Sequence, residues 1–129
     1  MSARKLDPNG DALVAEVAGY LERGEEPPQA ALRSAARYLL FVLEGVAPGR
    51  SVEVRVVPVA AVQCVEGPRH TRGTPPNVVE TDPVTWFRLA TGRLGWDGAV
   101  GSGAVRASGA RADLSAYLPL TRMSTKEIN

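Results

Sequence analysis

The one histidine of the chain, His70, is the side chain best suited to proton transfer near neutral pH. Arg69 and Arg72 flank it, and two neighbouring cations disfavour a protonated imidazole instead of orienting the ring as a base. A carboxylate such as Glu80 or Asp82 could still reach His70 in the fold. The sequence therefore favours a structural or solvent-exposed histidine over a catalytic one, and it leaves a histidine–carboxylate pair open.

A run without periodicity, Gly67 to Asn77, surrounds this histidine and contains three prolines. Its arginines, threonine hydroxyls and glycine-freed backbone amides could bind a phosphate or a carboxylate, or contact a partner protein. The spacing is not that of a phosphate-binding motif, because no glycine-rich turn opens a helix. We expect a loop whose candidate anion- or partner-contacting residues are Arg69, His70, Thr71 and Arg72.

Cys64 is the only cysteine, which excludes an internal disulfide and any cysteine-based metal cluster. No cation stands beside it in the sequence to lower its thiol pKa, so a buried structural cysteine is the better interpretation. Hydrolase, zinc-protease, P-loop and dinucleotide-binding motifs are all missing from the sequence. We therefore expect no catalytic residues, no metal and no cofactor, and hence a protein that is not an enzyme.

The chain of 129 residues has the length of one domain, which we assign to residues 1–129 with flexible tails at 1–10 and 121–129. Its 15 basic and 14 acidic residues leave a net charge of +1, so no net field draws in nucleic acid. The first ten residues lack the apolar stretch of a secretory signal, and no apolar run reaches the roughly 20 residues of a membrane span. We expect a cytoplasmic protein that neither binds nucleic acid nor inserts stably into a membrane.

Hydrophobic spacing of three and four residues marks the helical parts of the chain. Together with capping and terminating residues, it predicts helices from Asp11 to Gly24, Pro28 to Gly45 and Pro83 to Gly92, a short turn from Trp96 to Val100, and a closing helix from Ala110 to Leu118. The second helix is apolar on every side between Tyr38 and Leu43, so we expect it at the centre of the core.

Alternating polar and apolar residues mark the strands. This period predicts strands at Val52 to Val56, Ala60 to Val65, Val78 to Glu80 and Ala104 to Ser108. The connection between the first two is short, which favours an antiparallel hairpin.

Aromatic residues are few, and three of them fall close together. The chain has two tryptophans, three tyrosines and two phenylalanines, and Trp86, Phe87 and Trp96 lie within eleven residues. Such side chains either line a binding cavity or fill the core. The sequence leaves both alternatives open.

Two stretches of the chain resemble the sterol carrier protein type 2 family. The first is the run from Leu89 to Leu94 followed by Ala99, the glycine-bounded segment Gly103 to Gly109, and Leu114. The second, Val62 to Pro83, is similar to the bacterial branch of that family. The resemblance implies an α+β fold in which a mostly antiparallel five-stranded sheet is covered on one side by helices.

The same resemblance implies an apolar tunnel that accepts a small apolar molecule, such as a lipid, a fatty acid, an acyl-CoA or a sterol. The aromatic residues that we expect to contact it are Phe41, Trp86, Phe87, Trp96 and Tyr117. Because a fold does not fix a ligand, an alternative stays open. In it the chain is an accessory or interaction module, and the loop from Gly67 to Asn77 contacts another protein or domain, or an anionic cofactor.

Overall fold

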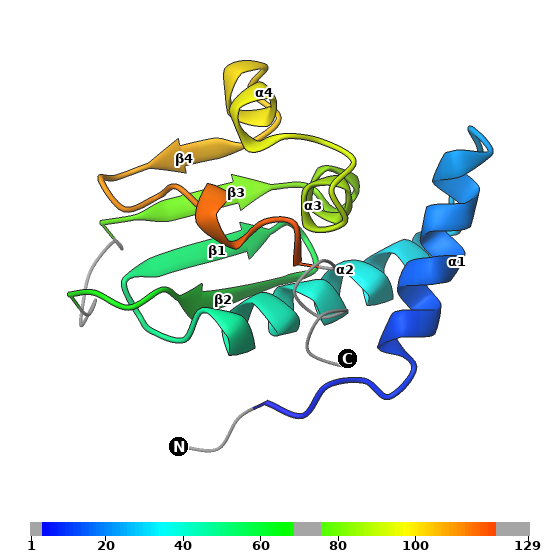
Figure 1. Cartoon of the computed structure of the whole chain (residues 1–129), viewed down its shortest axis with the longest axis horizontal. Helices are drawn as coiled ribbons and strands as arrows, with labels where there is room; N and C mark the ends of the chain where they lie inside the picture. The colour runs from blue at the N-terminus through cyan, green and yellow to red at the C-terminus, as the bar shows by residue number, and fades with distance from the viewer. Residues whose placement is uncertain (1–3, 69–75, 121–129) are drawn as a thin grey trace.

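The computed structural model describes residues 4–68 and 76–120 (Figure 1). Helices and strands both contribute to it, which confirms the mixed α+β class. In chain order the elements are α1 (Gly10–Glu22), α2 (Gln29–Val46), β1 (Val52–Val56), β2 (Ala60–Cys64), β3 (Val78–Thr81), α3 (Pro83–Ala90), α4 (Trp96–Gly101), β4 (Arg106–Ser108) and the 3-10 turn η1 (Ser115–Tyr117).

The strands form one sheet in the order β2-β1-β3-β4. The β1–β2 hairpin is antiparallel, as expected, and so is the β3–β4 pair, whereas β1 and β3 run parallel. The five-stranded sheet expected from the resemblance is wrong in its strand number, because the described residues form a mixed sheet of four strands. Between β2 and β3, Pro68 and Pro76 lack the N–H group that a strand ladder requires.

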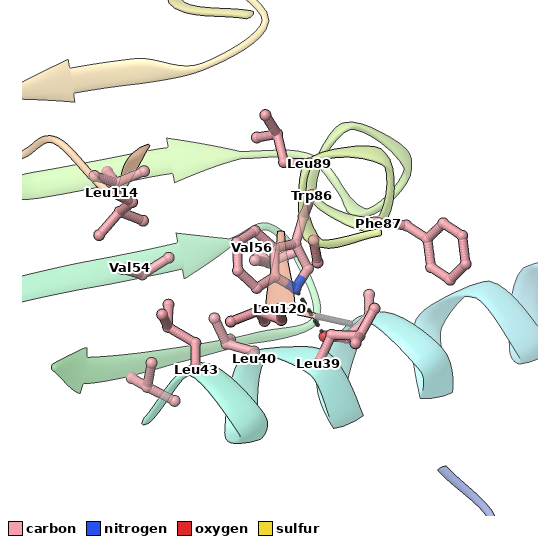
Figure 2. Packing of buried hydrophobic residues seen from close by; sticks show 14 of the residues in the cluster. Leu39, Leu40, Leu43, Val54, Val56, Trp86, Phe87, Leu89, Leu114 and Leu120 are labelled. Atoms are coloured by element: carbon pink, nitrogen blue, oxygen red, sulfur yellow. Dashed lines mark hydrogen bonds between the residues drawn. The ribbon is translucent and has the colours of Figure 1, made fainter. Parts of the chain in front are cut away.

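The two faces of the sheet differ in polarity. Along β1, Val52, Val54 and Val56 are buried on the face where α2 packs, and Figure 2 shows Leu40 and Leu43 of α2 pointing toward it. The opposite face carries a charged row in which Arg55, Glu80 and Arg106 are neighbours in register on β1, β3 and β4. Glu80 lies 3.8 Å from Arg55 Nη1 and 2.8 Å from Arg106 Nη2. The apolar interior therefore lies on the helical side of the sheet.

Two predicted helix ends are wrong. Gly45 does not stop α2, because the helix continues to Val46 and Ala47 N donates to Leu43 O at 2.9 Å. Asp11 does not cap α1, since the helix already begins at Gly10. The Asp11 carboxylate instead accepts a hydrogen bond from the Tyr38 hydroxyl at 2.8 Å and ties α1 to α2.

The predicted closing helix from Ala110 to Leu118 is also wrong. Only the three-residue turn η1 forms there, and the segment from 110 to 120 crosses in front of the sheet (Figure 1). Leu114 and Leu120 are both buried, at 0% and 1% exposure. Figure 2 shows Leu114 against the strands and Leu120 beside Trp86 and Val56, so the segment adds both leucines to the core without a regular helix.

Candidate apolar binding site

Helix α3 is held at its start by local hydrogen bonds. Asp82 is the N-cap residue, and its carboxylate accepts from Thr85 N at 2.9 Å and from Thr85 Oγ1 at 2.8 Å. Pro83 occupies the first turn, where its missing N–H costs nothing. This rigid start fixes the direction in which the next two residues, Trp86 and Phe87, project.

Trp86 lies between α3 and α2 in the apolar interior. Its side chain is 1% exposed, and Figure 2 shows it close to Val56, Leu40 and Leu120. The indole Nε1 donates to the carbonyl oxygen of Ala36 at 3.1 Å, so its single polar group is satisfied inside the core. Trp86 thus joins three elements, β1, α2 and the C-terminal segment, to α3.

Phe87 takes the opposite direction. It is 0% exposed, yet Figure 2 shows its ring pointing away from the strands, on the far side of α3 from Val56 and Leu114. Successive residues of a helix project about 100° apart, which accounts for the divergence from Trp86. Phe87 therefore packs on the other side of α3 from Trp86, within the same hydrophobic core.

The other three candidate ligand-binding residues lie at the margin of the core. Phe41 of α2 is half-buried, and the guanidinium carbon of Arg4 lies 4.2 Å from its ring centroid. Trp96 of α4 and Tyr117 of η1 are half-buried too, and both pack against the core. The structure thus brings Trp86 and Phe87 together on α3 and distributes the others over three elements.

Residues 4–9, within the predicted N-terminal tail, precede α1 and reach α2. Arg4 Nε donates to Glu44 Oε1 at 2.8 Å and Nη2 to Glu44 Oε2 at 3.3 Å. The same guanidinium stacks on Phe41, so this tail covers one side of a residue that we expected at a ligand. The predicted C-terminal tail, 121–129, lies outside the described residues.

Charge is missing from the interior of the described part of the chain. Its buried polar residues are Ser51, Asn77, Thr81 and Thr85, and none of their buried side-chain atoms is left without a hydrogen bond. The remaining buried residues are apolar and include the thiol of Cys64. Such an interior suits an apolar molecule and gives a charged one no partner.

Burial and, secondarily, the Glu44 carboxylate raise the pKa of Cys64 to about 12. Burial and the Asp11 hydrogen bond likewise raise the pKa of Tyr38 to about 12. Both groups hold protons in the folded state that the unfolded chain loses from about pH 8.5 for the thiol and about pH 10 for the phenol. The stability that these two groups contribute is therefore fully present below about pH 8.5 and is lost as the pH rises toward 12.

We expect the urea midpoint to be unchanged between pH 7 and 8 and to fall between pH 9 and 11. The fall should be shallower in Cys64→Ala and in Tyr38→Phe, because each variant removes one of the two groups that release protons on unfolding. Equilibrium urea titrations followed by circular dichroism measure this. An equal pH slope in wild type and both variants would contradict the assignment.

The candidate anion- or partner-contacting residues Arg69, His70, Thr71 and Arg72 lie outside the described residues, so their role stays a prediction. Both flanks of that segment are described and firmly held. Val65 adopts φ +67°, a rare conformation for a β-branched residue, and its carbonyl accepts from Ser51 N at 3.1 Å and Ser51 Oγ at 2.7 Å. On the other flank, Asn77 donates to Ser51 O at 2.9 Å and accepts from Arg111 N at 3.0 Å.

Two further findings concern the described residues alone. No group of three or more histidine, cysteine, aspartate or glutamate side chains among residues 4–68 and 76–120 is placed to hold a metal ion. None of the helices in these two ranges has the length and apolarity needed to cross a membrane.

The comparison with protein families found a match that includes α3. Residues 28–120 match the family described as bacterial SCP ortholog, where SCP denotes sterol carrier protein. The chain belongs to this family. The match runs from the start of α2 to Leu120 and thus includes the whole sheet, α3 and both buried leucines of the C-terminal segment. No curated protein matches the chain. The sterol carrier unit accounts for every element except α1 and the residues before it.

Several residues that shape this sterol carrier interior escaped sequence reasoning. Leu120 stands directly before the predicted tail at 121–129, and its apolarity just after Pro119 is the one signal of its burial. The contact of Tyr38 with Gly10 and the Ser51–Asn77 hydrogen bond join residues far apart in the chain. Neither contact leaves a periodic pattern that a sequence could display.

Proposed function

We propose that this sterol carrier family protein binds a small apolar molecule and carries it, without transforming it. The single observation that carries the proposal is the family match over residues 28–120, which makes a lipid-carrier role the natural reading of the fold. The apolar interior supports it, because a buried acyl chain or ring system gains about 0.8 kcal/mol per methylene group removed from water. The raised pKa of the Cys64 thiol speaks against a nucleophilic cysteine.

The finer assignment concerns which residues touch the molecule. We assign contact first to Trp86 and Phe87, which are fully buried on α3, and then to Phe41, Trp96 and Tyr117 at the margin of the core. A ligand in this interior has to displace or part side chains that now pack together. Palmitate, palmitoyl-CoA and cholesterol differ in length, charge and rigidity, so they separate the candidate ligand classes.

Tryptophan fluorescence tests the proposal, because the two indoles report from different places. Trp96→Phe leaves the buried Trp86 as the only emitter, and Trp86→Phe leaves the half-buried Trp96. We expect at least one of the three ligands to give a saturable one-to-one change, with a Kd in the micromolar range or tighter, about −8 kcal/mol. The larger change is expected in Trp96→Phe.

Native mass spectrometry of protein purified from its own host provides the independent readout. A bound mass in the range of a lipid, exchanged by the added ligand, supports the carrier function. If none of the three ligands gives saturable binding and the purified protein carries no such mass, the carrier function is wrong. Both outcomes leave the family membership untouched.

A further inference from the structure

Helix α1 stands outside the unit that the family shares. It spans Gly10–Glu22, whereas the family match begins at residue 28. Figure 1 places α1 at the end of α2, beside α3 and away from the strands. The sheet, α2 and α3 therefore make up the family's unit, and α1 is an addition to one end of it.

The attachment of α1 is shallow. Its buried residues are Gly10 and Val17, while α2 buries the side chains of Ala35, Ala36, Leu39, Leu40 and Leu43. Leu13, Val14, Ala18 and Leu21 of α1 are only partly buried. An element with one deeply buried side chain opens at a lower free energy than a core element such as α2, so α1 is suited to local opening.

A close backbone contact seats the start of α1 on α2. A Cβ atom placed on Gly10 would lie 2.1 Å from Cε1 of the Tyr38 ring, which shows that the ring packs directly on the glycine. The Tyr38 hydroxyl then donates to Asp11 Oδ1 at 2.8 Å. At the other end of the helix, Arg93 Nη2 pairs with Glu22 Oε2. Both polar contacts are at the surface, where water can replace them.

The connection from α1 to α2 can serve as a hinge. Gly24 has φ +72°, and no atom lies within 4 Å of the place where its Cβ would be. Glu25 and Glu26 follow and are exposed, before Pro27 and Pro28 lead into α2. A glycine with free space around it can absorb a change of backbone angle without a clash.

Phe87 of α3 marks the part of the apolar core that we assign to α1. Its ring is 0% exposed and points away from the strands, toward the side of α3 on which α1 stands in Figure 1. We propose that α1 is a hinged cover over the Phe87 side of the apolar core, and that an apolar ligand enters and leaves that core when this helix swings away from α2 and α3. This inference rests on the proposed function, because it assigns the route to the same interior.

Two glycines of α1 give a matched pair of variants. Gly10→Ala forces its methyl group into the Tyr38 ring and should lift the helix, whereas the Cβ of Gly19→Ala meets only the movable tip of Arg23, at 3.2 Å. Hydrogen exchange followed by mass spectrometry measures the opening. We expect amides of α1 to exchange at least tenfold faster than those of α2 and β1 in the wild type. Gly10→Ala should raise exchange in α1 a further tenfold and leave β1 unchanged, and Gly19→Ala should not raise it.

Stopped-flow mixing with the fluorescent fatty acid cis-parinaric acid measures the rates of ligand association and dissociation, which test the route. In Gly10→Ala the association and dissociation rates should both rise about tenfold, while the Kd changes less than about threefold. If Gly10→Ala does not fold, Tyr38→Phe keeps the ring on Gly10, removes only the hydrogen bond to Asp11, and should raise both rates at least twofold.

The outcomes separate the cover from the carrier function. The cover is wrong if the amides of α1 exchange hydrogen as slowly as those of β1. It is also wrong if the binding rates are equal in the wild type and in the folded α1 variants. Neither result contradicts ligand binding itself. If no variant binds cis-parinaric acid, palmitate or cholesterol at equilibrium, the carrier function itself fails, and the route proposed here fails with it.

Discussion

Trp86→Ala should lower the free energy of unfolding by about 3 to 5 kcal/mol, the usual cost of truncating a large aromatic in a packed core. The side chain is 1% exposed and its indole N–H bonds to Ala36 O, so truncation removes apolar burial and a satisfied hydrogen bond together. The cavity left behind would lie beside Leu40, Val56 and Leu120 (Figure 2). Urea unfolding of the purified variant measures the loss.

Trp96→Ala is the matched control, because it deletes the same side chain from a half-buried position. We expect it to cost less than about 2 kcal/mol, since much of its indole is already in water. Free indole distinguishes a true cavity from general loosening. It should raise the urea midpoint of Trp86→Ala and leave that of Trp96→Ala unchanged, because apolar cavities take up small aromatic molecules. Equal losses in the two variants would show that Trp86 does not anchor the core.

The first strand was predictable from a local signature, whereas the predicted strand Ala104 to Ser108 is shorter in the structure, with β4 limited to Arg106–Ser108 and exposed throughout. The alternation of Val52, Val54 and Val56 with charged residues required one buried and one polar face, and the register places Arg55 opposite Glu80 on that polar face. Asp82 and Pro83 likewise mark the start of α3. The parallel pairing of β1 and β3 has no such signature, because alternation fixes which face is buried and not the direction of the neighbouring strand.

The segment after β4 shows where periodicity misleads. Leu114, Tyr117 and Leu118 are spaced like one face of a helix, yet only the turn at Ser115–Tyr117 forms. Part of the reason is local, since Asp113 Oδ1 accepts from Ser115 N at 2.9 Å and Pro119 follows. The larger part is tertiary, because the space between α2 and α3 is filled by Leu120 and Trp86 together. No property of residues 110–120 alone specifies that space.

The candidate site was predictable in its residue types and not in its geometry. Clustering of Trp86, Phe87 and Trp96 in the sequence indicated an apolar centre, but neighbours on a helix diverge, and Trp96 belongs to α4. Trp86 and Phe87 therefore pack on two sides of α3 within one hydrophobic core. The distinction matters for the proposed route, because we assign the Phe87 side to α1, which lies outside the family match.

Gly109→Ala should be the most damaging single-methyl change at the end of β4, with a loss of at least about 3 kcal/mol. Gly109 has φ +103°, and an added Cβ would lie 2.2 Å from Pro76 O and 2.4 Å from Asn77 Oδ1. Strained backbone of this kind costs about 1 to 3 kcal/mol for a residue with a side chain. The clash adds to this, because Asn77 is buried and loses its hydrogen bonds to Ser51 O and Arg111 N if it moves.

Gly103→Ala isolates the part of the stability loss that comes from the strained backbone alone. Gly103 also has positive φ, at +84°, but nothing lies within 4 Å of its added Cβ, so only the conformational cost of about 1 to 2 kcal/mol remains. The difference between the two variants in free energy of unfolding, obtained from urea titrations, thus measures the cost of displacing Asn77 from its hydrogen bonds to Ser51 O and Arg111 N. A difference below about 1 kcal/mol would mean that Asn77 shifts away from the added methyl group at little cost. A larger one means that Asn77 resists displacement, because moving it breaks its hydrogen bonds to Ser51 O and Arg111 N.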